Sequence, residues 1–223
     1  MIERVFLLLF VVIAALELVS EFTGNRTLHL ATKPFIALIP LGIALLSKVI
    51  RDVSAKRFLI AGLICSWVGD CVLMFRSEYS WALLAGLGAF MLAHICYILS
   101  YRVGSNGTFT LTYFVVVPIL GYGIVLYSVL APYLGGMNIP VAVYAVILLG
   151  MLIAALERFS RTHRVSYRLV SIGAALFVVS DSVLAWNIFV QESVLARIVL
   201  MSSYSAAQML ITLGMVRHWS VKE

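Results

Sequence analysis

Charged side chains are scarce in this chain. Asp, Glu, Lys and Arg together make up 12% of its 223 residues, whereas 63% are apolar and the mean hydropathy is +1.07. Soluble domains carry about 25% charged residues. A water-soluble core of this size cannot hide so much apolar surface beneath so few charges. The scarcity of charge therefore excludes a soluble globular domain and predicts an integral, multi-pass membrane protein.

Cysteine is also rare, and the cysteines present lie within apolar runs. They are Cys65, Cys71 and Cys96. Their positions exclude a disulfide framework, and their spacing lacks the paired ligands of a zinc site. We therefore interpret them as packing residues and expect no metal ion and no other cofactor.

Acidic residues are outnumbered by basic ones, 10 against 16, which gives a net charge of +6. In a soluble chain this excess would suggest a nucleic-acid partner, but in so apolar a chain it indicates orientation in a membrane. We therefore expect membrane lipids, and no nucleic acid, as partners.

Apolar runs long enough to cross a membrane recur along the chain. A transmembrane helix needs about 20 residues to cross about 30 Å of hydrocarbon. The clearest breaks between the runs are Gly24-Asn25, Gly104-Ser105-Asn106-Gly107 and Gly135-Gly136. No break is long enough to form a second domain. The sequence thus predicts one all-α transmembrane domain over residues 1–223, with eight spans at about 5–20, 30–48, 58–75, 80–101, 111–130, 138–156, 168–190 and 194–216.

Basic residues are distributed unevenly between the two sides of this predicted bundle. Twelve fall on the side that holds both termini: Arg4, Lys48, Arg51, Lys56, Arg57, Arg102, Arg158, Arg161, Arg164, Arg168, Arg217 and Lys222. Only Arg26, Arg76 and Arg197 fall on the other side, and Lys33 lies inside the second span. Because cytoplasmic loops are enriched in Lys and Arg, both termini are predicted to be cytoplasmic. An odd number of spans would mix the two sets.

A short internal match suggests a duplication. Asp70-Cys71-Val72-Leu73 in the third span matches Asp181-Ser182-Val183-Leu184 in the seventh, 111 residues later. Spans that are four apart run in the same direction, so the match predicts a parallel four-plus-four repeat rather than an inverted one.

Several polar side chains lie inside the predicted spans. An ionised group at the centre of a transmembrane helix costs about 2.5 to 3.5 kcal/mol, so each one needs a partner or a function. The ionisable ones are Glu17, Lys33, Asp70, His94 and Asp181, and their polar companions are Tyr97, Tyr204 and Gln208. At about 1.5 Å per residue, most of them fall in the outer half of the membrane, with His94 and Gln208 nearer the middle. One pocket reaching from the outer leaflet to the midplane would collect them all.

Each of these residues also has a purely structural interpretation. A lone carboxylate can bind a neighbouring helix, Lys33 can extend its ammonium to the interface, and His94 can bond a carbonyl group. Two aspartates at matched depth with a lysine nearby favour a functional interpretation instead.

The order of these residues resembles the YhhN, or lysoplasmalogenase, family of membrane proteins between about residues 32 and 212. The landmarks are Thr32-Lys33-Pro34, Val68-Gly69-Asp70, Ala93-His94 with Tyr97, Ser180-Asp181, and Tyr204 with Ala206-Ala207-Gln208. The resemblance implies hydrolysis of the vinyl ether bond of lysoplasmalogens to a fatty aldehyde and glycerophosphoethanolamine or glycerophosphocholine. A lysophospholipid is then the expected substrate.

Two carboxyl groups suit this chemistry. Cleaving a vinyl ether requires an acid to protonate the double bond and a base to activate water, as glycosidases do for a similar cation. Burial in a membrane pocket favours the protonated form of one carboxyl group, while pairing with Lys33 would keep the other ionised. We therefore expect Asp70 and Asp181 to be catalytic, in either order. The expected substrate-binding residues are Lys33, His94, Tyr97, Tyr204, Gln208 and Glu17.

Other functions remain open at this point. A small transporter would use the two aspartates as a relay, and a lipid-binding protein would use them only to hold its ligand. An intramembrane aspartyl protease is disfavoured, because its Gly-x-Gly-Asp signature needs glycine where this chain has Trp67. The membrane would be the inner membrane of a bacterium or the endoplasmic reticulum of a eukaryote, and the sequence leaves the oligomeric state open.

Overall fold

The computed structural model describes residues 2–47, 52–103, 113–159 and 161–220, and within these ranges the chain forms helices and no strands. The α-helices are α1 (Ile2–Thr23), α2 (Arg26–Leu46), α3 (Val53–Leu73), α4 (Ser80–Arg102), α5 (Tyr113–Leu134), α6 (Asn138–Leu156), α7 (Arg164–Phe189) and α8 (Val194–Ser220), with a short 3-10 turn at Gly135–Met137. The cations Lys48, Arg51 and Lys222 and the expected break at residues 104–107 lie outside the described ranges.

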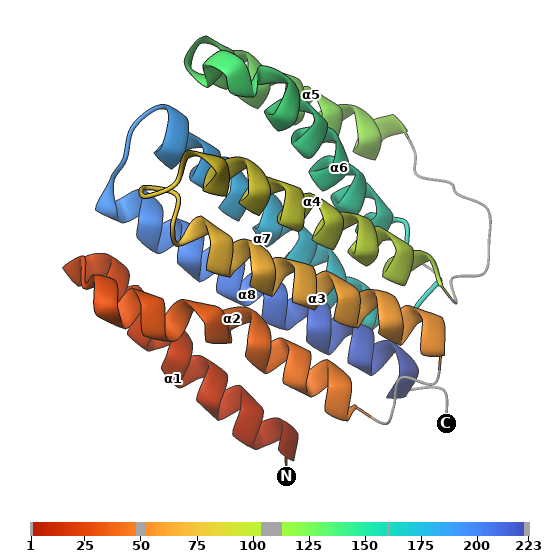
Figure 1. Ribbon diagram of the computed structural model, residues 1–223. Helices are drawn as coiled ribbons and strands as arrows, with labels where there is room; N and C mark the ends of the chain where they lie inside the picture. The colour runs from red at the N-terminus through yellow and green to blue at the C-terminus, as the bar shows by residue number, and fades with distance from the viewer. Residues whose placement is uncertain (1, 48–51, 104–112, 160, 221–223) are drawn as a thin grey trace.

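The helices run side by side along one common direction (Figure 1). Helices α3, α4, α7 and α8 form the middle of the bundle, with α1 and α2 along one side and α5 and α6 along the other. The most extensive contacts join α7 to α8 and α3 to α4. Helix α1 begins and α8 ends at the same end of the bundle (Figure 1).

Within the described residues, six stretches are long and apolar enough to cross a membrane: Arg4–Thr23, Arg26–Leu46, Ser80–Arg102, Tyr113–Leu156, Arg164–Phe189 and Val194–Arg217. The fourth contains both α5 and α6. Helix α3 is not among them, because Lys56, Arg57 and Asp70 make it too polar for this criterion. The predicted class, an all-helical membrane protein, is confirmed, while the number of spans stays a prediction.

The helix boundaries follow local sequence signals. Gly24 ends α1 in a left-handed conformation (φ +67°), and the side chain of Asn25 caps α2 by accepting a hydrogen bond of 3.1 Å from the backbone N–H of Leu28. The largest deviation from the expected ranges is the start of α3, at Val53 rather than near residue 58. Helix α5 also continues through Pro132 to Leu134 rather than ending near residue 130. A proline deletes only the one backbone bond to the residue four positions earlier, which does not end a helix that lipid surrounds.

Apolar side chains cover the outer faces of the peripheral helices. Leu8 and Phe22 on α1 and Phe114 and Ile124 on α5 are among the most exposed. In water such a surface would drive aggregation, whereas in a bilayer it contacts lipid tails. The polar side chains named above lie instead inside the bundle.

A buried arginine joins four helices at the end of the bundle that holds the start of α1. Arg158, just beyond α6, donates hydrogen bonds to the carbonyl oxygen of Tyr101 (3.3 Å) and to Ser166 Oγ (2.9 Å). Ser166 in turn donates to the carbonyl oxygen of Gly214 at 2.7 Å. Burial lowers the pKa of Arg158 to about 10, because it disfavours the charged form.

Candidate active site

Asp70 lies at the end of a chain of buried hydrogen bonds between α3, α4 and α8. Tyr97 OH donates to Gln208 Oε1 (2.8 Å), Gln208 Nε2 donates to Tyr204 OH (3.0 Å), and Tyr204 OH donates to Asp70 Oδ2 (2.6 Å). Ser66 Oγ lies 3.3 Å from Tyr97 OH at the other end. Because each donor points toward the next acceptor, the chain ends in a hydrogen bond donated to the Asp70 carboxyl group, which fixes the orientation of that group.

Asp181 has a separate set of partners on α4 and α6. Tyr144 OH donates a hydrogen bond to Asp181 Oδ2, and His94 Nε2 lies 3.4 Å from the same oxygen. His94 Nδ1 lies 2.5 Å from the carbonyl oxygen of Phe90, which can only accept, so this nitrogen must carry a proton. In a neutral ring Nε2 is then an acceptor, and it faces Asp181 without a hydrogen bond to it.

The two aspartates are close enough for their carboxyl charges to act on one another, but an aromatic ring separates their partners. The ring of Phe177 lies between His94 and Tyr204, with centroid distances of 4.7 and 5.5 Å. Both carboxyl groups are buried, Asp70 at 2% and Asp181 at 8% exposure. The two carboxyl groups are thus held in one core in two distinct surroundings.

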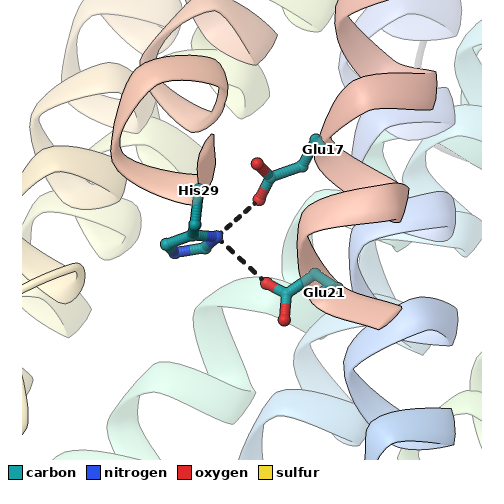
Figure 2. A group of neighbouring side chains, drawn as sticks. All are labelled: Glu17, Glu21 and His29. Atoms are coloured by element: carbon teal, nitrogen blue, oxygen red, sulfur yellow. Dashed lines mark ion pairs between the residues drawn. The ribbon is translucent and has the colours of Figure 1, made fainter. Parts of the chain in front are cut away.

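Glu17 belongs to a third cluster, near the end of the bundle where α1 meets α2 (Figure 2). His29 Nδ1 lies 2.9 Å from Glu17 Oε1 and 3.2 Å from Glu21 Oε1, and Thr32 Oγ1 donates to Glu17 Oε2 at 2.5 Å. Arg197 Nε also pairs with Glu21 Oε2, at 3.1 Å. A protonated His29 makes both short contacts attractive.

The same three side chains have donor atoms that could hold a metal ion, since these atoms lie within 4.8 Å of one another. Arg197 and Lys33, however, act electrostatically on Glu21 and already supply positive charge there. We therefore interpret Glu17, Glu21 and His29 as an ion-pair cluster.

Lys33 connects this cluster to Asp70. It lies one helical turn beyond His29 on α2, is only 7% exposed, and acts electrostatically on Asp70 as well as on Glu21. Its burial disfavours the alternative of a side chain extended to the membrane interface.

An apolar cleft of about 50 Å³ reaches Asp181 between α5, α6 and α7. Its apolar walls include Leu126, Leu148 and Val178. Its polar lining residues are Tyr122, Tyr127, Tyr144, Asp181 and Ser182. This volume has room for the first carbons of an alkyl chain beside Asp181, and the rest of the chain would extend beyond the cleft.

The family model that matches this chain is the YhhN family, over residues 28–215. The chain belongs to the YhhN family. The resemblance inferred from the landmark residues is therefore confirmed.

The chain is also similar to proteins from an animal and from a bacterium. The chain is 34% identical over 161 residues to "Lysoplasmalogenase TMEM86B" of Homo sapiens, covering 72% of this chain and 64% of the human protein. It is 30% identical over 201 residues to "Lysoplasmalogenase" of Mycobacterium bovis, covering 87% of this chain and 73% of the mycobacterial one. No solved structure matches the chain.

The structure places every residue that the sequence analysis predicted for the site within the bundle. These residues are distributed over the clusters around Asp70, Asp181 and Glu17. It also adds polar residues that the sequence analysis missed, above all Tyr144, His29 and Glu21. The four-residue spacings Glu17 to Glu21 and His29 to Lys33, on two adjoining helices, were a usable signal for that cluster. Tyr144 offered none, since it lies in an otherwise apolar run.

Proposed function

We propose that this chain is a lysoplasmalogenase, an enzyme that hydrolyses the vinyl ether bond of lysoplasmalogens to a fatty aldehyde and a glycerophosphoalcohol. The observation that carries the proposal is the pair of buried carboxyl groups, Asp70 and Asp181, each accepting a hydrogen bond from a buried tyrosine. The names of the human and mycobacterial relatives support the same reaction.

We assign the acid to Asp181 and the base to Asp70. Lys33 acts electrostatically on Asp70, whereas the described partners beside Asp181 are Tyr144 and His94, with no Lys or Arg among them. Asp181 also borders the apolar cleft, where the alkenyl chain would place its double bond. In the proposed resting state the two aspartates share one proton, which Asp181 carries beside the double bond of the substrate.

The reaction then proceeds in two halves. Asp181 gives its proton to the second carbon of the vinyl ether, and the first carbon becomes an oxocarbenium ion. Asp70 takes a proton from water as the water oxygen bonds to that carbon, which yields a hemiacetal. Asp70 next returns its proton to the glycerol oxygen as the carbon–oxygen bond breaks, and Asp181 takes the hydroxyl proton of the forming aldehyde. One water is consumed and both aspartates regain their starting states.

The decisive measurement is aldehyde release from a lysoplasmalogen by the purified protein in detergent. We expect Asp70→Asn and Asp181→Asn each to lower kcat by at least about a hundredfold, because each removes one partner of the proton transfer. Asp52→Asn is the matched control, because Asp52 caps α3 far along the chain from either aspartate. Unchanged release in either aspartate variant would overturn the mechanism, and no release from the unaltered protein would overturn the function.

We also propose that the eight helices each cross the membrane, with both termini cytoplasmic. The shared end for the start of α1 and the end of α8 supports an even number of crossings (Figure 1). Helix α3 would cross despite its charges, because Asp70 is buried against α8 rather than exposed to lipid.

A parallel four-plus-four repeat is the arrangement we infer for these helices. Residues 111 positions apart have matching surroundings: Gly62 and Gly173 both lie in close contact with the following helix, and Asp70 and Asp181 both accept from a tyrosine. Tyr97 and Gln208, also 111 apart, bond directly to each other. Direct contact between equivalent residues is expected at a two-fold axis, which supports an axis running between α4 and α8.

A further inference from the structure

A cavity of about 550 Å³ opens at the end of the bundle opposite the start of α1. Its walls come from the junctions of α1 with α2, α3 with α4 and α7 with α8. Arg26, Arg76 and Arg197 all line it. These are the same three basic residues that the charge count assigns to the outer side of the membrane, where Lys and Arg are otherwise avoided. Because all three line one cavity, we infer that they have a function there, which explains why they are kept on the side of the membrane where basic residues are rare.

The three arginines differ in whether their positive charge is already paired with a carboxylate. Arg197 pairs with Glu21 at 3.1 Å and with Glu192 at 2.9 Å, and Arg26 pairs with Glu78. The side chain of Arg76 has no ion pair or hydrogen bond within the part of the chain that the structure describes. Arg76 is therefore the cation that an anionic ligand would meet without displacing a carboxylate.

The start of α2 adds further donors beside Arg26. Gly24, Asn25 and Arg26 line the cavity at this helix N-terminus, where backbone N–H groups lack partners inside the helix. A phosphate group is bound well by such N–H groups together with arginine. The wall between Arg26 and Arg76 thus has the chemistry of a phosphate site.

The cavity lies at the right distance from the aspartates for a lysolipid. Met74 lines it one turn beyond Asp70, and Asn187 lines it less than two turns beyond Asp181, so it begins about 6 to 9 Å outward along the helices. Five covalent bonds separate the ether oxygen of a lysoplasmalogen from its phosphorus atom, a span of comparable length. A substrate with its vinyl ether between the aspartates would place its phosphate in this cavity.

The positively charged ammonium group of such a head group also has a binding partner at the cavity. Glu192 is 61% exposed at the cavity and would accept from an ammonium group. Among the described residues that line the cavity, none is Phe, Tyr or Trp. A trimethylammonium group is recognised mainly by aromatic rings, whereas a primary ammonium needs hydrogen-bond acceptors.

We propose that the outer cavity binds a phosphoethanolamine head group, with Arg76 and Arg26 on the phosphate and Glu192 on the ammonium. This inference rests on the proposed lysoplasmalogenase function, because it assigns the head group of that substrate. It makes the enzyme selective for ethanolamine over choline lysolipids.

Binding of a saturated analogue tests the proposal independently of catalysis. The probe is 1-O-alkyl lysophosphatidylethanolamine, which has the head group but no vinyl ether to cleave, titrated into the detergent-solubilised full chain by calorimetry. We expect Arg76→Gln to raise its Kd about tenfold, the effect of losing one charge-assisted hydrogen bond. The affinity for a 1-O-alkylglycerol without phosphate should not change. Arg57→Gln, at the other end of α3 and exposed, is the matched control.

A second pair of titrations tests the ammonium partner. The unaltered protein should bind the ethanolamine analogue at least about fivefold more tightly than the choline analogue, and Glu192→Gln should remove most of this preference. An unchanged Kd in Arg76→Gln, or equal affinity for both head groups in the unaltered protein, would overturn the assignment. Failure of the proposed function is a different result, since it would appear as absent aldehyde release while analogue binding still depends on Arg76.

Discussion

At the level of single residues, each aspartate has its own tyrosine partner: Tyr144 bonds to Asp181, and Tyr204 bonds to Asp70. Each phenol donates a hydrogen bond to one oxygen of a carboxyl group and so orients that group. The other carboxyl oxygen is left to exchange a proton with substrate or water. The proposed roles give the two tyrosines different effects. Tyr144 supports the acid and Tyr204 supports the base.

Removing the Tyr144 hydroxyl should slow the chemical step. We expect Tyr144→Phe to lower kcat about tenfold with little change in KM, because one buried hydrogen bond to the acid is lost while the ring still packs. Steady-state aldehyde release measures both constants. Tyr133→Phe is the control, since its side chain is 55% exposed and does not line the cleft beside Asp181. A raised KM with unaltered kcat would place Tyr144 in substrate binding instead.

The Glu17, Glu21 and His29 cluster leads to a prediction about metal ions. If these residues form an ion-pair cluster balanced by Arg197 and Lys33, then activity needs no metal. We expect aldehyde release to be unchanged after dialysis against a chelator, and metal analysis of the purified protein to find less than one ion per chain. Loss of activity that zinc or manganese restores would identify the cluster as a metal site after all.

Sequence reasoning reached part of this chemistry and missed part, for a physical reason. Asp70 and Asp181 stand out because a charge inside a membrane helix is costly, so its presence alone is informative. Tyr144 does not stand out, because tyrosine is compatible with lipid, packing and hydrogen bonding alike. Only the packing of α6 against α4 and α7 shows that its hydroxyl meets Asp181.

At the level of helices, glycines set how closely the central pair α3 and α4 can approach. A Cβ atom added at Gly62 would lie 2.6 Å from the ring of Tyr97, which is closer than packed atoms tolerate. That ring begins the hydrogen-bond chain to Asp70. The close helix contact and the orientation of the carboxyl group therefore depend on the same residue.

Enlarging this glycine should cost both stability and activity. We expect Gly62→Ala to destabilise the protein by about 1 to 3 kcal/mol, because the rigid ring of Tyr97 must shift. Thermal unfolding in detergent measures the change, and kcat should fall with it because the chain to Asp70 is displaced. Gly88→Ala on α4 is the matched control, because an added Cβ there meets nothing within 4 Å. Equal melting temperatures for the two variants would contradict this account of the contact.

Helix positions were more predictable than their contacts. Each expected span overlaps one observed helix, because the length of an apolar run directly reflects membrane thickness. The largest error is the start of α3, which begins at Val53 rather than near residue 58, because the apolar run begins only after the charged residues Lys56 and Arg57. The end of α5 was also missed, since this helix continues through Pro132 to Leu134. In a membrane, continuing the helix past a proline costs less than exposing unpaired backbone to lipid.

At the level of the whole molecule, the orientation of the bundle decides which solution reaches the outer cavity. A lysolipid that enters from the outer side of the membrane can reach both the three arginines of the cavity and the two aspartates only if α3 crosses the membrane. Helix α3 is also the helix whose charges make a crossing least obvious from composition. Its topology is therefore the feature of the fold most worth measuring.

Two single-cysteine variants can measure it. Ser54→Cys lies in the first turn of α3 and Gly136→Cys lies after α5, both at exposed positions, in a background with Cys65, Cys71 and Cys96 replaced by alanine. If α3, α4 and α5 all cross, the two positions are separated by three crossings and lie on opposite sides of the membrane. If α3 does not cross, they are separated by two and lie on the same side.

We expect a membrane-impermeant maleimide applied to intact cells to label the Gly136→Cys variant and not the Ser54→Cys variant. Both should be labelled after the cells are permeabilised, which serves as the control for accessibility. Labelling of both in intact cells, or of neither, would remove α3 from the set of crossing helices. Labelling of Ser54→Cys alone would keep α3 in the membrane but invert the bundle, and the arginine-lined cavity would then face the cytoplasm. Only the expected pattern places that cavity where a lysolipid of the outer leaflet can enter it head group first.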